Sequence, residues 1–212
     1  MVSTRSQNKM TFADKVRAKG FSMADCKFMK LNMLFPVMLG LAHATVALWS
    51  GSGLAAAVVD LIPHKNVPLF TLFVVPVYAI ILSIVALQGL AALAPKGYQS
   101  QIGRAAKAPG AIEELSFPGS GWIERVQAAQ YNTWEAAILA VCCFFVATEE
   151  KLSASLFTDL AALFLVCRIV YPLPYALDLD LLRTQVWLTG LYACIMVGAC
   201  ALYPGTMQPL FA

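Results

Sequence analysis

The sequence is short of charged residues, which make up 13% of the 212-residue chain, and the shortage is concentrated in long stretches. Soluble domains carry roughly a quarter charged residues. Three stretches hold no charge: 31–59, 66–95 and 184–212. Two more hold a single charge each, Glu135 within 126–148 and Arg168 within 160–177. Because a helix crosses a bilayer with about 20 mainly apolar residues, we predict an integral, multi-pass membrane protein.

Several other patterns are also missing. The apolar runs are continuous and do not alternate over segments of about ten residues, which excludes a transmembrane β-barrel. The chain has no GxGxxG or P-loop context, no zinc-ligand spacing and no Ser–His–Asp set, so no metal site is predicted. Five of the six cysteines lie in apolar runs without CxxC spacing and are interpreted as small buried hydrophobes. The net charge of +3 does not indicate a nucleic-acid partner.

The apolar runs predict an all-α fold. A first apolar helix should run from Leu31 to about Trp49 and stop at the Ser50–Gly53 turn. Leu54–Ile62 is too short to span, so it should lie at the interface or re-enter the membrane. Four further spans are predicted over 69–94, 122–148, 156–176 and 184–203.

The basic residues predict an orientation. The first 30 residues carry seven lysines and arginines against two aspartates, and form a basic arm before the first apolar helix. With five crossing segments, this arm, the loop from Pro95 to Gly121 and Arg183 share one side, while Lys65 and Lys151 lie on the other. The positive-inside rule makes the first side the cytoplasm-like one.

Two charges lie deep within predicted spans. Glu135 and Arg168 lie at similar depth in consecutive helices joined by a short turn, so we expect them to meet. A structural ion pair that fixes the helix register would explain both residues without any ligand. His43 in the first apolar helix has no partner in the sequence and is expected to make a helix contact.

Polar residues flank these two charges at helical spacing. Arg125, Ala128, Asn132 and Glu135 share one helix face, and Tyr171 and Tyr175 follow Arg168 on its own face. Such a face lines a cavity or a helix contact. Interhelical hydrogen bonding would equally explain Asn132, and interfacial anchoring would explain the tyrosines. The prolines at 172 and 174 predict a bend, and a lone juxtamembrane arginine such as Arg183 is most often a topology marker.

Together these motifs resemble the MAPEG family, the membrane-associated proteins in eicosanoid and glutathione metabolism. The resemblance rests on Arg125-x6-Asn132-x2-Glu135, on Arg168-x2-Tyr171-x3-Tyr175, and on Arg183-Thr184 opening the last helix. The stretch from Leu177 to Trp187 is most like the bacterial-type branch. The resemblance covers about residues 69–203. It therefore divides the chain into a basic arm (1–30), an extra apolar helix with its connection (31–68) and a MAPEG-like four-helix membrane domain (69–212).

The resemblance implies a transmembrane four-helix bundle that assembles as a trimer in membrane lipid and binds glutathione between protomers. It further implies transferase, peroxidase or isomerase activity on lipophilic substrates. By motif position, the glutathione-binding residues would be Asn132, Glu135, Arg168, Tyr171 and Tyr175. Arg183 would be catalytic, because a fixed cation lowers the pKa of a nearby thiol and raises its thiolate fraction.

The chain departs from the family pattern at two positions. Glutathione-using members commonly carry an arginine where this chain has Ala128, or where it has Tyr131, and each is a cation for a glutathione carboxylate. These losses, together with the basic arm and the extra helix, favour a second hypothesis: a catalytically silent accessory subunit of a larger membrane complex. A transporter is a weaker hypothesis, because the sequence shows no inverted repeat.

Overall fold

The computed structural model describes residues 27–93, 120–177 and 179–211. The chain divides into two compact units, residues 1–39 and residues 40–212. The described part of the first unit is the beginning of α2 (Lys27–Trp49). Most of the predicted basic arm, most of the loop from Pro95 to Gly121, and Cys26 lie outside the described residues.

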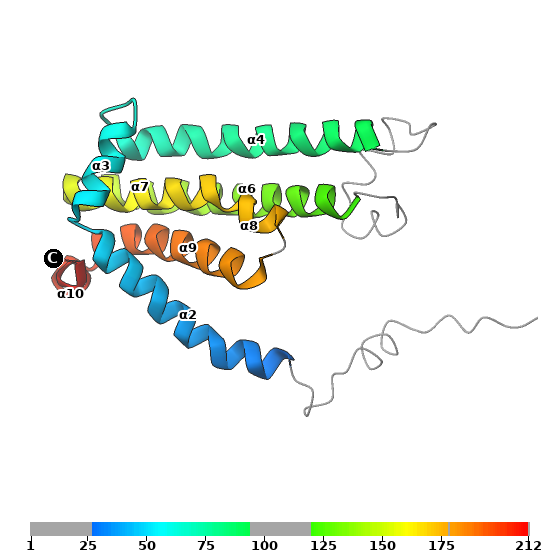
Figure 1. Ribbon diagram of the computed structural model, residues 1–212. Helices are drawn as coiled ribbons and strands as arrows, with labels where there is room; N and C mark the ends of the chain where they lie inside the picture. Colours follow the sequence, from blue (N-terminus) through cyan, green and yellow to red (C-terminus); the bar gives the residue numbers. More distant parts are fainter. Residues whose placement is uncertain (1–26, 94–119, 178, 212) are drawn as a thin grey trace, which may run out of the picture. The chain divides into compact units, whose positions relative to one another are not determined.

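Four helical stretches of the second unit are long and apolar enough to cross a membrane. They are α4 (Val67–Leu93), α6 (Ser120–Glu149), α7 (Ala154–Val170) with α8 (Pro172–Ala176), and α9 (Asp180–Leu202). Each runs opposite in direction to the stretch before it in the sequence (Figure 1). The predicted all-α, four-helix transmembrane fold with an extra N-terminal helix is confirmed, and the protein is an integral multi-pass membrane protein.

The four helices pack in a closed order that differs from their order in the sequence. α4 packs against α6 and α7, and α9 packs against the same two helices. Within the described ranges, α6 and α7 are not a closely packed pair, although a turn of only a few residues joins them. They therefore lie diagonally across the bundle and meet through large side chains. The Phe144 ring of α6 lies 5.2 Å from the Phe157 ring and 6.1 Å from the Phe164 ring, both of α7.

The N-terminal addition contains a sharp turn that is fixed against α7. After α2, Gly51 adopts φ +70°, and α3 (Gly53–Leu61) starts at an angle of 77° to α2. The Trp49 Nε1 donates to the Asp159 carbonyl at 2.8 Å, and the Gly51 amide donates to the Asp159 carboxylate at 2.9 Å. This break confirms that the short apolar segment does not continue the preceding helix.

His43 makes the interhelical contact that was predicted for it. Its Nδ1 lies 2.8 Å from the hydroxyl of Tyr192 on α9, and the two rings meet edge to face. The hydrogen bond joins α2 to the last long helix within the second unit.

The last span begins earlier than the sequence predicted. Charged residues at 178–183 were expected to hold the helix start at Thr184, but α9 begins at Asp180. An acidic residue in the first turn is favourable beside the positive end of the helix dipole. Asp180 also pairs with Arg183 one turn later, so these charges begin the helix. After α9 the chain ends in α10 (Pro204–Met207) and a 3₁₀ turn (Gln208–Phe211).

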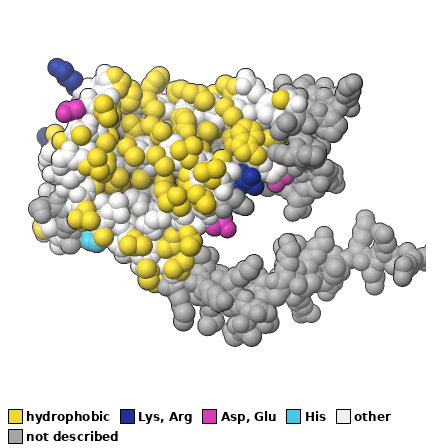
Figure 2. Space-filling model, in the orientation of Figure 1, with side chains coloured by type: hydrophobic (Ala, Val, Ile, Leu, Met, Phe, Trp, Pro, Cys, Tyr) yellow, Lys and Arg dark blue, Asp and Glu magenta, His cyan; other side chains and the backbone are white. Residues whose placement is uncertain are grey.

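The outside of the bundle is apolar over the length that faces a membrane. Side chains such as Phe73, Ile84, Ile138 and Phe145 are between 47% and 69% exposed. On the visible face hydrophobic side chains cover the middle of the bundle, whereas charged side chains lie toward its two ends (Figure 2). This distribution suits a bundle surrounded by lipid.

Candidate functional site

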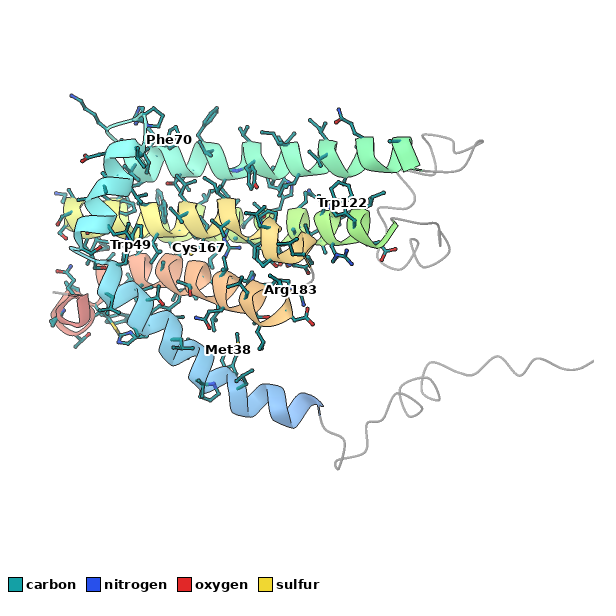
Figure 3. All side chains as sticks on the ribbon, in the orientation of Figure 1. Met38, Trp49, Phe70, Trp122, Cys167 and Arg183 are labelled. Atoms are coloured by element: carbon teal, nitrogen blue, oxygen red, sulfur yellow. The ribbon has the colours of Figure 1, made fainter. Side chains whose placement is uncertain are left out.

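The predicted site residues come from four elements that meet near one end of the bundle. Asn132 and Glu135 are on α6, Arg168 is on α7, Tyr175 is on α8, and Arg183 is on α9. Arg183 lies close to α8, toward the end of the bundle at which Trp122 of α6 also lies (Figure 3). The site thus combines residues up to 51 positions apart in the sequence.

Two prolines shape the part of the site that carries the tyrosines. α7 ends at Val170, Tyr171 keeps helical dihedrals (φ −50°, ψ −40°), and α8 then begins at Pro172. Because proline has no amide hydrogen, Pro172 and Pro174 interrupt the hydrogen-bond ladder there. The disturbance predicted from the prolines takes the form of this helix break. Just before this break, the Ile169 carbonyl accepts a hydrogen bond from the Tyr78 hydroxyl of α4 at 3.1 Å.

A chain of direct contacts joins four of the predicted residues. The Asn132 Nδ2 donates to the Tyr171 hydroxyl at 2.8 Å. The Tyr171 and Tyr175 rings meet edge to face with their centroids 5.3 Å apart. The Arg183 guanidinium carbon lies 4.5 Å from the centre of the Tyr175 ring. We call these four residues the polar network.

The polar network is open to the outside at Arg183. The Arg183 side chain is 29% exposed, and its Nη2 lies 2.9 Å from a carboxylate oxygen of Asp180, which is 74% exposed. At the other extreme, Tyr171 is 2% exposed. The network therefore leads from a cation that a ligand can reach to a buried phenol held by an amide.

Arg168 lies beneath the network in the core of the bundle. It is 0% exposed, its Nη2 donates to the Trp187 carbonyl at 2.9 Å, and its guanidinium lies 5.4 Å from the Phe164 and Tyr171 ring centres. Its Nε and Nη1 find no hydrogen-bond partner among the described residues. A buried cation with unmet donors is costly. In this position Arg168 supports the Tyr171 ring from within.

The predicted pairing of Glu135 with Arg168 is wrong. Glu135 is exposed, and the ion pair within the described ranges is Arg183 with Asp180. Two facts of the packing explain the error. α6 and α7 lie diagonally across the bundle, and Glu135 is turned outward whereas Arg168 is turned inward. A short connecting turn therefore did not make the two helices close neighbours.

The polar face of α6 lies at the edge of its buried stripe. Ala129, Thr133 and Ala136 are 0%, 0% and 5% exposed, whereas the next position along the surface, Asn132, is half-buried. Beyond it, Glu135 is exposed together with Tyr131. The site thus opens sideways, from the inside of the bundle toward the outer surface of α6.

Sequence reasoning missed two residues that shape the site. Asp180 orients Arg183 and is three positions before it, a spacing at which opposite charges pair on a helix. Gly190 of α9 faces Arg168 so closely that a Cβ there would lie 2.7 Å from Arg168 Nη2. No local sequence signal indicates this second contact, because it depends on how α7 and α9 pack.

The described cysteines do not belong to the polar network. Cys167, Cys194 and Cys200 are buried, as expected for small hydrophobes, whereas Cys142 is exposed on the outer face of α6. All five described cysteines are free thiols.

Comparison with known proteins identifies one family. The MAPEG family model matches residues 69–203, which include the whole polar network and Glu135. No curated protein and no solved structure matches the chain.

Proposed function

Because the chain belongs to the MAPEG family, we propose that it is a glutathione-dependent transferase or peroxidase that acts on lipophilic electrophiles dissolved in the bilayer. Family membership supports a membrane protein related to glutathione or eicosanoid metabolism. The observation that carries the narrower proposal is the polar network, in which Asn132, Tyr171, Tyr175 and Arg183 form one continuous line of contacts.

The chemistry of the polar network fits glutathione. The tripeptide presents two carboxylates, an ammonium group and a thiol. Arg183 offers a guanidinium that remains accessible beside Asp180, and guanidinium groups bind carboxylates and stabilise thiolates. The Tyr171 and Tyr175 phenols and the Asn132 amide offer further polar atoms from neighbouring elements. When bound, glutathione would supply a thiolate nucleophile, and we assign its stabilisation to Arg183.

We assign Arg168 a positioning role in this function. Since it is fully buried, it acts through the Tyr171 ring, against which its guanidinium packs. A fixed Tyr171 in turn holds the hydroxyl that receives the Asn132 hydrogen bond. Catalytic and binding groups need this kind of support, because small displacements cost activity.

Formation of the thiolate tests the proposed role of Arg183. Bound thiolate absorbs in the ultraviolet, so glutathione can be titrated with pH in the presence of the full-length protein in detergent. We expect the bound thiol to ionise at lower pH than free glutathione, with a pKa below about 8.5. Arg183→Gln should move the ionisation back toward the free value. Identical titrations of the two proteins would contradict the assignment.

Glu135 supports a trimeric assembly. It follows Ser120 by 15 residues and precedes Glu149 by 14, which places it in the middle of a membrane-spanning helix, yet its side chain is exposed. A carboxylate in contact with lipid at that depth is expensive and normally faces protein or water. We therefore propose that a second copy of the chain covers this face of α6, and we assign Glu135 to glutathione binding at that interface.

Two finer assignments concern the branch of the family and the bounds of the domain. We propose that the protein belongs to the bacterial-type branch of the family, on the stretch from Leu177 to Trp187. We also propose that residues 69–212 form the MAPEG domain, with residues 31–68 added to it. The contacts of Trp49 and Gly51 with Asp159 support the second assignment, because they fix the middle of the added segment on the domain.

A second candidate function is a catalytically silent accessory subunit of a larger membrane complex. Ala128 and Tyr131 occupy positions at which glutathione-using relatives carry a cation, and neither can replace it. α3 packs against α7, so part of the domain surface is already covered by the added segment. Purification of the native protein separates the two proposals: a homo-oligomer that binds glutathione supports the enzyme, and one copy among unlike subunits supports the accessory role.

A further inference from the structure

A hollow lies at the end of the bundle opposite to the polar network. It has a volume of about 590 Å³ and is formed where α4 begins, α6 ends and α7 begins. In Figure 1 these three helix ends lie together, at the end of the bundle away from α8. Lys65, Thr148 and Lys151 contribute polar groups to its lining, and Leu72, Phe144 and Phe157 contribute apolar surface. Its volume is within the range of small-molecule sites.

Positive charge gathers around this hollow. Among the basic residues described in residues 40–212, Lys65 and Lys151 line it, although 86 positions separate them in the sequence. The lining itself includes no acidic residue, although Glu149, Glu150 and Asp159 are each next to a lining residue in the sequence. The hollow is therefore suited to an anion.

Lys151 occupies a backbone position that favours glycine. Its φ is +54°, and no other non-glycine residue in the described ranges has a positive φ. It follows the C-terminus of α6, where the Leu152 amide donates to the Ala147 carbonyl at 2.9 Å. Glycine is the usual residue at this point of such a helix end, because it adopts positive φ without strain. A strained residue that lines a cavity suggests that its side chain has a use there.

One helix N-terminus adds to the positive potential. α7 begins at the hollow, with Ala154 in its lining. The start of α4, by contrast, is already capped, because Pro68 has no amide hydrogen and the Leu69 amide donates to the Asn66 Oδ1 at 3.0 Å. Ser153, at the start of α7, makes no side-chain capping hydrogen bond. The first amides of a helix and its dipole favour an anion. Together with the two lysines, the start of α7 provides the elements of a phosphate site.

An apolar hollow adjoins the first. It has a volume of about 480 Å³, and its lining includes Phe70 and Phe73. The two hollows share Leu69 and Leu72. Phe73 is 69% exposed toward the outside of α4. A basic hollow next to an apolar one matches a molecule with an anionic head and a hydrocarbon tail.

We propose that this end of the bundle binds an anionic phospholipid of the surrounding bilayer, with its phosphate between Lys65 and Lys151 and an acyl chain on α4. The location agrees with this occupant, because the hollow lies at the ends of three membrane-spanning segments, at headgroup depth. The site is separate from the polar network, so it stands whether or not the protein uses glutathione.

Native mass spectrometry of the full-length protein in detergent tests the proposal. Phosphatidylglycerol and phosphatidylcholine are added separately, and the bound fraction of each lipid is followed with concentration. We expect phosphatidylglycerol to bind more tightly. Each lysine near a lipid surface is worth about 1 kcal/mol, so removing one should weaken phosphatidylglycerol binding about fivefold. K65Q/K151Q should therefore remove most of the preference.

Two controls separate this site from general electrostatics and from loss of structure. K96Q/K107Q removes the same charge from the loop at 94–119, outside the described residues, and should leave the preference intact. Lys151→Gly removes the charge and relieves the positive-φ strain, so it should weaken lipid binding about fivefold while thermal stability in lipid-free detergent is kept or raised. Equal binding of the two lipids, or equal losses in the cavity and loop variants, would overturn the proposal.

Discussion

At the scale of single residues, Gly190 has the most direct effect on the core of the site. An added Cβ would lie 2.7 Å from Arg168 Nη2 and 2.9 Å from Cys167 Cβ. We expect Gly190→Ala to destabilise the protein by about 1 to 3 kcal/mol, because overpacking displaces a buried guanidinium. Thermal unfolding in detergent measures the effect. Gly198→Ala is the matched control on the same helix, since its nearest neighbour, Cys143, lies at 3.6 Å, and a similar loss there would refute the packing argument.

The hydrogen bond between Asn132 and Tyr171 makes a second prediction at this scale. Tyr171→Phe removes the hydroxyl and keeps the ring that packs on Arg168 and Tyr175. Asn132→Ala removes the donor. If the 2.8 Å contact stabilises the site, a double-mutant cycle on unfolding should give a coupling free energy of about 1 kcal/mol. Additive effects of the two substitutions would show that the contact contributes nothing.

At the scale of elements, the turn between α2 and α3 depends on one backbone conformation. Gly51 has φ +70°, whereas Gly53 begins α3, and a Cβ at either position would meet no atom within 4 Å. Gly51→Ala should therefore lower the free energy of unfolding by about 1 kcal/mol through backbone strain alone. Gly53→Ala should be neutral or slightly stabilising, because alanine is a better helix former. The stabilities of both variants can be compared by thermal unfolding. Equal changes in stability would contradict the requirement for a positive φ at Gly51.

The helices could largely be predicted from the sequence, because a long run without charged residues is a strong signal for a membrane-spanning helix. The charge-free run gave α4 within two residues of its observed bounds, and Pro172 and Pro174 indicated the helix break at Tyr171. The start of α9 was misplaced, because Asp180 was interpreted as an interruption although it stabilises a first turn. The bounds of the membrane helices can therefore be predicted from the charge-free runs, except where a charged residue forms part of the first turn of a helix.

The packing of these elements could not be predicted in the same way. The sequence indicated candidate site residues, and the structure joins four of them in the polar network. It did not indicate that α6 and α7 lie diagonally, and for this reason the expected pairing of Glu135 with Arg168 was wrong. Nor could it indicate the contact of Gly190 with Arg168, which depends on the packing of α7 against α9. Sequence motifs thus indicate candidate residues, whereas the spatial arrangement of the helices determines which of these residues are in contact.

At the scale of the whole molecule, the exposed Glu135 predicts assembly. If a second copy of the chain covers the outer face of α6, Glu135→Lys should weaken the oligomer, because it places a cation where each interface of a trimer now has a carboxylate. Native mass spectrometry or light scattering of the detergent-solubilised protein gives the oligomeric state. Glu149→Lys, the same change in charge at the exposed end of α6, is the control. A trimer that survives both substitutions, or a monomeric native protein, would contradict the proposed interface.

We propose that the polar network is a glutathione site, and calorimetric titration of glutathione into the purified protein in mild detergent tests this claim. We expect saturable binding by the native protein. Arg183→Ala should weaken it by about tenfold or more, since a charge-assisted contact is worth roughly 1.5 to 3 kcal/mol. Gly53→Ala, far from the network in the sequence, should bind as the native protein does. No heat of binding at millimolar glutathione, from protein shown to be folded, would contradict the claim and favour the accessory-subunit proposal.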